Sequence, residues 1–224
     1  MSVTSITPRG KGSRYIAVEG PIGVGKTELA KRLAASLSAR ALLEDVDNNP
    51  FLRRFYTQGP SAALPAQMFF LFARARQLEE LRQSDLFTDG HVADYLFAKD
   101  RLFAELNLDH DELALYDQVA ARLDIDPLVP DLVVYLQAPV DTLLQRIAKR
   151  GRPSEHLIER SYLERLGDAY ARFFHAYDEG PLLIVNASQI DPVNNEADYQ
   201  QLFRQIEKIG GGRHYFNPVS AVLA

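Results

Sequence analysis

The sequence predicts an α/β fold, a single doubly wound domain in which a parallel sheet of five strands is flanked by helices. Short apolar runs rich in β-branched residues alternate along the chain with longer segments in which apolar residues recur every three to four positions. Strands that alternate with helices pair in parallel through right-handed crossovers. No linker divides the chain, because its Pro and Gly residues fall at the ends of predicted elements.

Each predicted strand is a short apolar run, and each predicted helix carries apolar residues on one face. In the first helix, for example, Leu29, Leu33 and Leu37 lie four positions apart. Asn49, just before Pro50, is a suitable N-cap residue for the second helix. The strands are expected at residues 14–19, 41–44, 91–94, 131–136 and 181–185. The helices are expected at residues 26–38, 50–56, 62–84, 109–123, 140–150, 157–177 and 195–209.

Composition narrows the class of protein. The chain has 224 residues, of which 46% are hydrophobic, and this suits one domain of the larger kind, here residues 14–209. We expect residues 1–13 to be flexible and residues 210–224, which begin with three glycines, to form a mobile tail. The absence of cysteine excludes disulfides, thiolate metal sites and a cysteine nucleophile.

Charge and hydropathy also limit the partners. No apolar run approaches the roughly 20 residues that a membrane helix needs, and residues 1–13 lack the apolar core of a signal peptide. A net charge of −5 argues against a protein that coats nucleic acid. We therefore expect a cytoplasmic protein that binds small molecules, not nucleic acid or membrane.

The strongest motif is Gly-Pro-Ile-Gly-Val-Gly-Lys-Thr at residues 20–27, which fits the pattern G-x-x-x-x-G-K-[ST] between a strand and a helix. Its glycines let backbone N–H groups converge on phosphate oxygens, and the helix N-terminus adds partial positive charge. Lys26 is expected to bridge the terminal phosphates of ATP, and the Thr27 hydroxyl to hold Mg²⁺.

Two other classes share parts of this motif. Gly20, Gly23 and Gly25, with Glu44 roughly 20 positions further on, would also suit a dinucleotide-binding loop, but nothing in that fingerprint requires a Lys-Thr pair. The chain has no Asn-Lys-x-Asp motif and no D-x-x-G motif, and its central strand does not end in Asp-Glu. These observations argue against GTPases and motors and favour a small-molecule kinase.

Two carboxylates support a kinase. Glu44 and Asp94 end the second and third predicted strands, and the carboxyl ends of parallel strands line the ligand crevice. One carboxylate would accept the proton of an attacking hydroxyl, and the other would order that hydroxyl or Mg²⁺. Which residue has which role stays open, and either acid would also suit an ordinary cap or turn.

A basic segment follows at residues 146–152, where Arg146, Lys149, Arg150 and Arg152 lie within seven positions. Such an arginine-rich lid can cover a triphosphate and screen the charge of the transfer step. Basic residues are also favoured at a helix C-terminus by its dipole, which is the simpler explanation of the same pattern.

A third set points to recognition of a base. Gln67 and Arg74 share a face of the long helix among apolar residues, so they need polar partners, and a flat hydrogen-bonding base is a suitable one. The alternative is that both side chains reach solvent. Arg160 and Glu164 lie four apart and are spaced to pair on a surface helix.

These segments together resemble the bacterial deoxynucleoside kinases, relatives of the mitochondrial and cytosolic deoxyguanosine, deoxyadenosine and deoxycytidine kinases. The resemblance runs from about residue 15 to residue 186. The segments that carry it are the phosphate loop at 18–27, Leu-Glu-Asp-Val-Asp-Asn-Asn-Pro-Phe-Leu-Arg-Arg-Phe-Tyr at 43–56, the helix at 66–74, the acidic strand end at 92–104, the basic segment at 146–152 and Tyr-Leu-Glu at 162–164.

The resemblance implies a homodimeric P-loop kinase that phosphorylates the 5′-hydroxyl of deoxynucleosides with ATP and Mg²⁺. It implies that Lys26 and Thr27 serve ATP and Mg²⁺ and that Glu44 and Asp94 flank the 5′-hydroxyl, with Glu44 also near the metal. The remaining expected roles are the 3′-hydroxyl for Tyr56 and Glu164, the base for Gln67, Arg74 and Asp100, and the lid for Arg146, Arg150 and Arg152.

One position departs from the family. Many relatives place arginine directly after the acid of the third strand, whereas this chain has Tyr95. A cation on the transferred phosphoryl group is therefore missing, or Lys99 or Arg101 supplies it.

The Asp100 carboxylate can only accept hydrogen bonds, so we expect it to favour bases with an exocyclic amine and to repel a keto oxygen. This predicts purine deoxynucleosides or deoxycytidine as substrates in preference to thymidine. The alternatives are a thymidylate-type nucleoside monophosphate kinase and an inactive nucleotide-binding regulatory protein.

Overall fold

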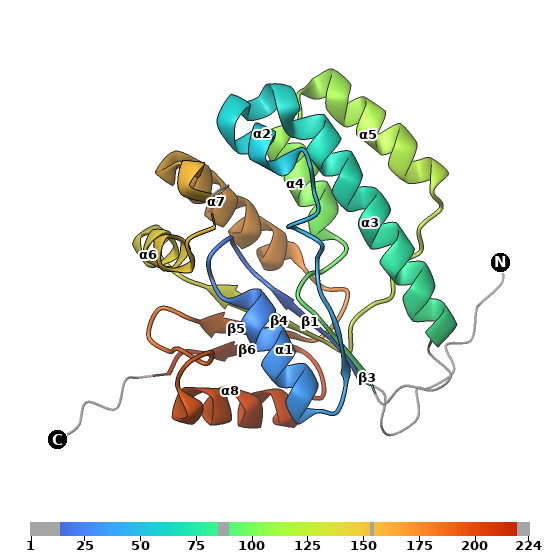
Figure 1. Cartoon of the computed structure of the whole chain (residues 1–224). Coiled ribbons are helices and arrows are strands. Elements are labelled where there is room, and N and C mark those ends of the chain that lie inside the picture. The colour runs from blue at the N-terminus through green and yellow to red at the C-terminus, as the bar shows by residue number, and fades with distance from the viewer. Residues whose placement is uncertain (1–13, 85–89, 153–154, 219–224) are drawn as a thin grey trace.

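The computed structural model describes residues 14–84, 90–152 and 155–218, so the expectations for residues 1–13 and 219–224 lie outside it. Its centre is a parallel sheet of six strands in the order β2-β3-β1-β4-β5-β6 (Figure 1). All five predicted strands form, and a sixth joins them. The strands are β1 (Arg14–Glu19), β2 (Arg40–Leu42), β3 (Gly90–Ala93), β4 (Leu132–Gln137), β5 (Leu182–Asn186) and β6 (Arg213–Phe216).

Helices flank the sheet on both faces. They are α1 (Lys26–Ser36), α2 (Leu52–Gln58), α3 (Ala63–Ser84), α4 (Lys99–Asn107), α5 (His110–Arg122), α6 (Val140–Arg150), α7 (Arg160–Ala176) and α8 (Glu196–Lys208). Short 3₁₀ turns precede α3 and α7, at Gly59–Ala62 and Glu155–Leu157. Among the described residues, no helix is both long enough and apolar enough to cross a membrane.

The alternation of side chains along β1 explains the layers. Ile16 and Val18 point into a core that also holds apolar residues of α1, α6 and α8. Ala17 points to the opposite face and packs with residues of α4 and α7, such as Leu102 and Tyr170. Successive strand residues face opposite sides, so an all-apolar strand is buried on both. Figure 1 shows α1 and α8 on one side of the sheet and α7 on the other.

The sixth strand corrects the expectation of a mobile tail from residue 210. Residues 213–216 pair in parallel with β5, and Leu182 N donates to Gly212 O at 2.9 Å. The glycines form a turn into this strand, with Gly212 at a φ of 74°. Phe216 packs against the core, whereas Tyr215 is exposed. Such an edge strand is exposed along most of its length, so it lacks the apolar run that marked the others.

Helix α4 was not expected, because its sequence was interpreted only as part of an acidic strand end. Its first turn holds Lys99 and Asp100, and both charged side chains are buried. A second local difference concerns Asn49, which precedes α2 without capping it. Its Oδ1 accepts from Phe51 N at 3.0 Å, and its Nδ2 donates to Ala66 O at 3.1 Å. The segment before α2 is thereby tied to α3.

Candidate active site

The segment between β1 and α1 has the conformation that its glycines allow. Gly20 has a φ of 148°, and a Cβ there would lie 2.4 Å from Leu136 O of β4. Gly25 has a φ of 104° and is the N-cap of α1. A side chain at either position would strain the backbone or collide with it. The loop therefore passes tightly over the carboxyl ends of β1 and β4 and opens α1 with free N–H groups.

Lys26 folds back over this loop. Its Nζ donates to Gly20 O at 2.7 Å and to Pro21 O at 3.1 Å. Burial, and then the neighbouring charge of Lys99, lowers the pKa of Lys26 to about 8. The ammonium group thus lies against the carbonyl groups of the phosphate loop, in surroundings that disfavour its charge.

Asp94 directly follows β3 and connects two parts of the site. Its Oδ2 accepts from the Thr27 hydroxyl at 2.6 Å, and its Oδ1 accepts from Glu44 N at 2.7 Å. Burial raises the pKa of Asp94, and the hydrogen bond from Thr27 opposes that shift without cancelling it. The phosphate-loop hydroxyl and the strand-end acid are therefore in direct contact.

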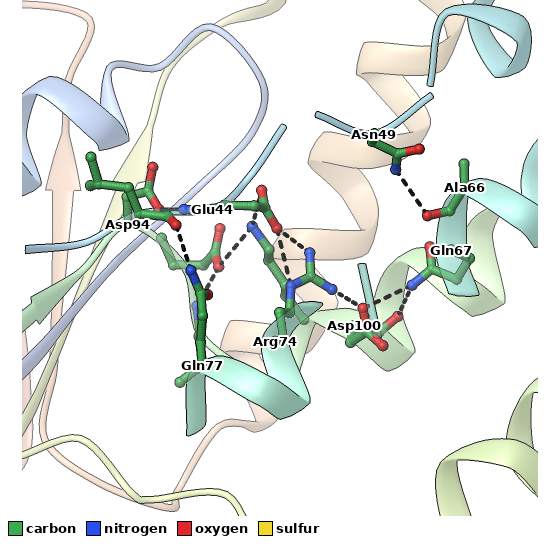
Figure 2. A network of polar contacts seen from close by, with 12 residues as sticks. Glu44, Asn49, Ala66, Gln67, Arg74, Gln77, Asp94 and Asp100 are labelled. Atoms are coloured by element: carbon green, nitrogen blue, oxygen red, sulfur yellow. Dashed lines mark hydrogen bonds and ion pairs between the residues drawn. The ribbon is translucent and has the colours of Figure 1, made fainter. Parts of the chain in front are cut away.

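Glu44 lies two residues beyond β2, in the loop toward α2. Its Oε1 forms an ion pair with Arg74, and its Oε2 lies 3.2 Å from Lys99 Nζ (Figure 2). Burial alone would raise the pKa of Glu44, but Lys99 and Arg74 outweigh it and lower the pKa to about 2. Glu44 is therefore ionised throughout the neutral range.

The structure separates the two cations that were candidates for the missing arginine. Lys99 is 3% exposed and lines the same cavity as Lys26 and Glu44. Arg101 points outward and pairs with Glu105 at 3.5 Å and with Asp117 at 3.4 Å. Lys99 is thus the cation that reaches the site.

Glu19, the last residue of β1, was missed by the sequence analysis. Its fully buried carboxylate accepts from Gly20 N, Leu96 N and Tyr170 Oη, each at 2.8 Å. Lys99 Nζ lies 3.7 Å from the same carboxylate. An acid at the end of an otherwise apolar strand was the available signal, since such a group needs several partners.

A single cavity connects these groups with α2, α3 and α7. The predicted residues that line it are Gly23, Lys26, Thr27, Glu44, Tyr56, Gln67, Arg74, Asp94, Arg150 and Arg152. Five predicted residues do not line it: Gly20, Gly25, Asp100, Arg146 and Glu164. Gln67 and Arg74 are buried, not solvent-exposed, which excludes the alternative considered for them.

Asp100 lies behind the cavity wall. It accepts from Gln67 Nε2 and forms an ion pair with Arg74 (Figure 2). It also accepts from Tyr116 Oη at 2.6 Å. With three partners it does not face a base. The expectation that its carboxylate repels a keto oxygen directly is therefore wrong, and Asp100 is connected to the cavity wall through Gln67 and Arg74.

The position of Glu164 also differs from the one expected. Its side chain is 56% exposed and lies 4.0 Å from Arg160, so the surface-pair alternative describes it. Each residue advances about 100° around a helix, so Tyr162 and Glu164 point to nearly opposite sides of α7. Tyr162 lines the cavity instead, together with Glu155. Glu155 is buried and accepts from Arg150 Nε at 2.9 Å.

The arginines of the basic segment at residues 146–152 occupy two different kinds of position. Arg150 and Arg152 line the cavity, and Arg152 also lies 3.3 Å from Asp47. Arg146 donates instead to Val24 O at 3.1 Å and to Ala187 O at 2.8 Å. It therefore ties α6 to the phosphate loop and to the segment after β5.

These features define a P-loop phosphotransferase, in which a phosphate loop, two lysines and two carboxylates near strand ends line one cavity. The family model described as "Deoxynucleoside kinase" matches residues 16–209. The chain belongs to the deoxynucleoside kinase family, which confirms the resemblance and identifies an ATP-using kinase.

Individual kinases are similar to this chain over most of its length. The chain is 36% identical over 202 residues to a deoxyguanosine kinase of Bacillus subtilis (strain 168), with 87% of this chain and 97% of that protein covered. It is 28% identical to the deoxyadenosine/deoxycytidine kinase of the same organism, with 87% and 92% covered. A structure of deoxyadenosine kinase from M. mycoides with products dCMP and a flexible dCDP bound is similar, with a TM-score of 0.74, 26% identity, and 87% and 100% coverage.

Proposed function

We propose that this chain transfers the γ-phosphoryl group of ATP to the 5′-hydroxyl of deoxynucleosides, with purine deoxynucleosides and deoxycytidine as substrates. The observation that carries the proposal is one cavity lined both by the phosphate loop and by Gln67 and Arg74. Asp94 and Glu44 link these two ends through Thr27 and Arg74. The names of the bacterial relatives support this choice of substrates.

In this proposal Glu44 receives the proton. Its low pKa keeps it ionised, so its oxygen is free of a proton and can accept a hydrogen bond from the 5′-hydroxyl. Phosphoryl transfer passes through a loose transition state, in which positioning matters more than early deprotonation. A weak but well-placed acceptor is therefore sufficient.

Thr27 and Asp94 are the residues that would hold Mg²⁺, in place of the expected pair of Thr27 and Glu44. Both offer oxygen atoms, the ligand type that Mg²⁺ prefers, and they are already in contact. Arg74 and Lys99 beside Glu44 would repel a dication. The chemistry that Mg²⁺ would supply there is positive charge, which would stabilise the negative charge that develops on the phosphates during transfer.

The cations have separate tasks. Lys26 would hold the terminal phosphates of ATP. Lys99 would balance the negative charge of the transferred phosphoryl group. Many relatives have an arginine for this purpose at the position of Tyr95. Arg150 and Arg152 would act as the lid, which their position on the cavity supports.

The sugar would lie between Tyr56 and Glu155, which takes over the role expected of Glu164. Both residues line the cavity, and burial raises the pKa of Tyr56 well above its usual value, so its hydroxyl stays a donor. Their contact with the 3′-hydroxyl would leave little room beside the 2′ carbon and favour deoxyribose over ribose.

A coupled assay that follows ADP formation tests the proposal, with ATP and each of the four deoxynucleosides, their monophosphates and adenosine. We expect turnover with deoxyguanosine, deoxyadenosine or deoxycytidine, little with thymidine and less with adenosine than with deoxyadenosine. Turnover with monophosphates alone would indicate a monophosphate kinase, and no turnover with any acceptor would indicate a regulatory protein. Light scattering tests the expected homodimer.

A further inference from the structure

The amide of Gln67 has one orientation in this network. Its Nε2 donates to Asp100 O at 2.9 Å and to Asp100 Oδ1 at 3.0 Å (Figure 2). The backbone carbonyl and the ionised carboxylate are both acceptors, so the opposite orientation would place Gln67 Oε1 against two acceptors. Both Nε2 hydrogens are thereby used. Among the described residues none donates to Oε1, which is the atom left for a ligand.

Tyr116 of α5 holds the carboxylate that sets this orientation. Its hydroxyl donates to Asp100 Oδ2 at 2.6 Å, and its ring is buried. Burial raises the pKa of Tyr116 to about 12, so the hydroxyl stays a donor at neutral pH. Arg74 pairs with the other oxygen of Asp100. Asp100 is thus held on both sides, and Tyr116 acts on the cavity only through it.

The cavity therefore offers a base one acceptor beside donors. The acceptor is Gln67 Oε1, and the donors are the N–H groups of Arg74 beyond those directed at Glu44 and Asp100. A 6-oxopurine presents the complementary pair, an N1–H donor next to the O6 acceptor. Adenine in the same position has the reverse order: its N1 lone pair would face Gln67 Oε1, and its N6 amine would face the N–H groups of Arg74. The Gln67 amide cannot reverse to donate to N1, because Nε2 is committed to Asp100. Thymine repeats the complementary pair at N3 and O4 but adds a methyl group next to O4.

We propose that Tyr116, through Asp100, fixes the orientation of the Gln67 amide and so selects 6-oxopurine deoxynucleosides, deoxyguanosine and deoxyinosine, over deoxyadenosine. This inference rests on the proposed function and names its preferred substrate class. Tyr116 is a positioning residue, since it does not line the cavity.

The test compares wild type, Tyr116→Phe and a matched control, Tyr177→Phe. Tyr177 is also buried, and its hydroxyl has no hydrogen-bond partner within the described ranges. The measurement is kcat/KM with ATP for deoxyguanosine, deoxyinosine and deoxyadenosine. We expect wild type to favour both 6-oxopurines and Tyr116→Phe to reduce that preference about tenfold, the scale of one lost hydrogen bond to a charged group. A merely structural role would lower all three values together, and Tyr177→Phe is expected to keep the wild-type ratio.

A second measurement needs no variant. The deoxyriboside of 2-aminopurine keeps the 2-amine of guanine but lacks N1–H and O6, so calorimetry with wild type is expected to show binding at least about tenfold weaker than for deoxyguanosine. Equal binding, a wild-type preference for deoxyadenosine, or an unchanged ratio in Tyr116→Phe would overturn the inference. Absence of turnover with every deoxynucleoside would instead contradict the proposed function.

Discussion

At the scale of single residues, Lys26 lies in the phosphate loop and has a lowered pKa. Its pKa of about 8 lies below that of a free lysine, so the ammonium form dominates below this pH and is lost above it. We expect the Kd for ATP to rise about tenfold or more between about pH 7 and about pH 9.5. Calorimetry at constant ionic strength measures this, and Lys26→Met is expected to bind ATP weakly with a flatter pH profile. A wild-type Kd that is independent of pH would contradict this assignment.

The two carboxylates should differ in their response to metal. Asp94→Asn removes a ligand that we assign to Mg²⁺, so it is expected to raise the Mg²⁺ concentration needed for half-maximal rate about tenfold or more. Glu44→Gln removes the proton acceptor, so it is expected to lower kcat by roughly 10²–10⁴-fold and to leave the Mg²⁺ dependence as in wild type. Initial rates over a Mg²⁺ titration distinguish the two roles, and the reverse pattern would exchange them.

Lys99 and Arg101 offer a matched pair, two residues apart on α4. Lys99→Met removes the cation in the cavity, so kcat is expected to fall by roughly 10²–10³-fold. Arg101→Met removes an exposed cation and is expected to stay within about twofold of wild type. Thermal unfolding of both variants shows whether Lys99→Met destabilises the protein. Comparable activity of the two would mean that Lys99 is not the replacement for the missing arginine.

At the scale of elements, strand β6 packs against the rest of the molecule on one of its faces only. Phe216 packs against the core, while its neighbour Tyr215 is 71% exposed. Phe216→Ala is therefore expected to lower the free energy of unfolding by about 1–3 kcal/mol, and Tyr215→Ala to change it by less than about 0.5 kcal/mol. Denaturant unfolding measures both values. Equal, small effects would mean that residues 213–216 contribute little to the sheet.

The elements also show where sequence patterns are sufficient. Five strands follow from short apolar runs, and the phosphate loop follows from glycines and Lys-Thr in a fixed pattern. Helix α4 escaped prediction because its buried positions include Lys99 and Asp100, which interrupt the apolar periodicity. Both charges are buried against polar groups of the candidate site, Lys99 beside Glu44 and Asp100 beside Arg74. Such buried polar contacts break the apolar pattern from which a helix is predicted.

At the scale of the whole molecule, the site residues predicted from the sequence lie in one motif or at the end of a strand. The residues that were missed reach the site only through tertiary packing. Lys26 and Thr27 belong to one contiguous motif, and Asp94 ends a predictable strand. Glu155 and Tyr116 come from separate elements, and only tertiary packing brings them to the cavity wall or behind it. Helical spacing also misled, because Tyr162 and Glu164 are neighbours in sequence but face opposite ways on α7.

Glu19 forms hydrogen bonds with three separate segments of the molecule, and this limits the residues that can replace it. Its carboxylate binds the phosphate loop, the segment after β3 and α7 and lies close to Lys99, so it has only donors around it. Glutamine would turn an N–H group toward another donor, and aspartate is one methylene shorter. In a saturation library selected for kinase activity, position 19 is therefore expected to be as intolerant as position 26, although Glu19 does not line the cavity. Frequent survival of Gln or Asp there would show that these four contacts are dispensable.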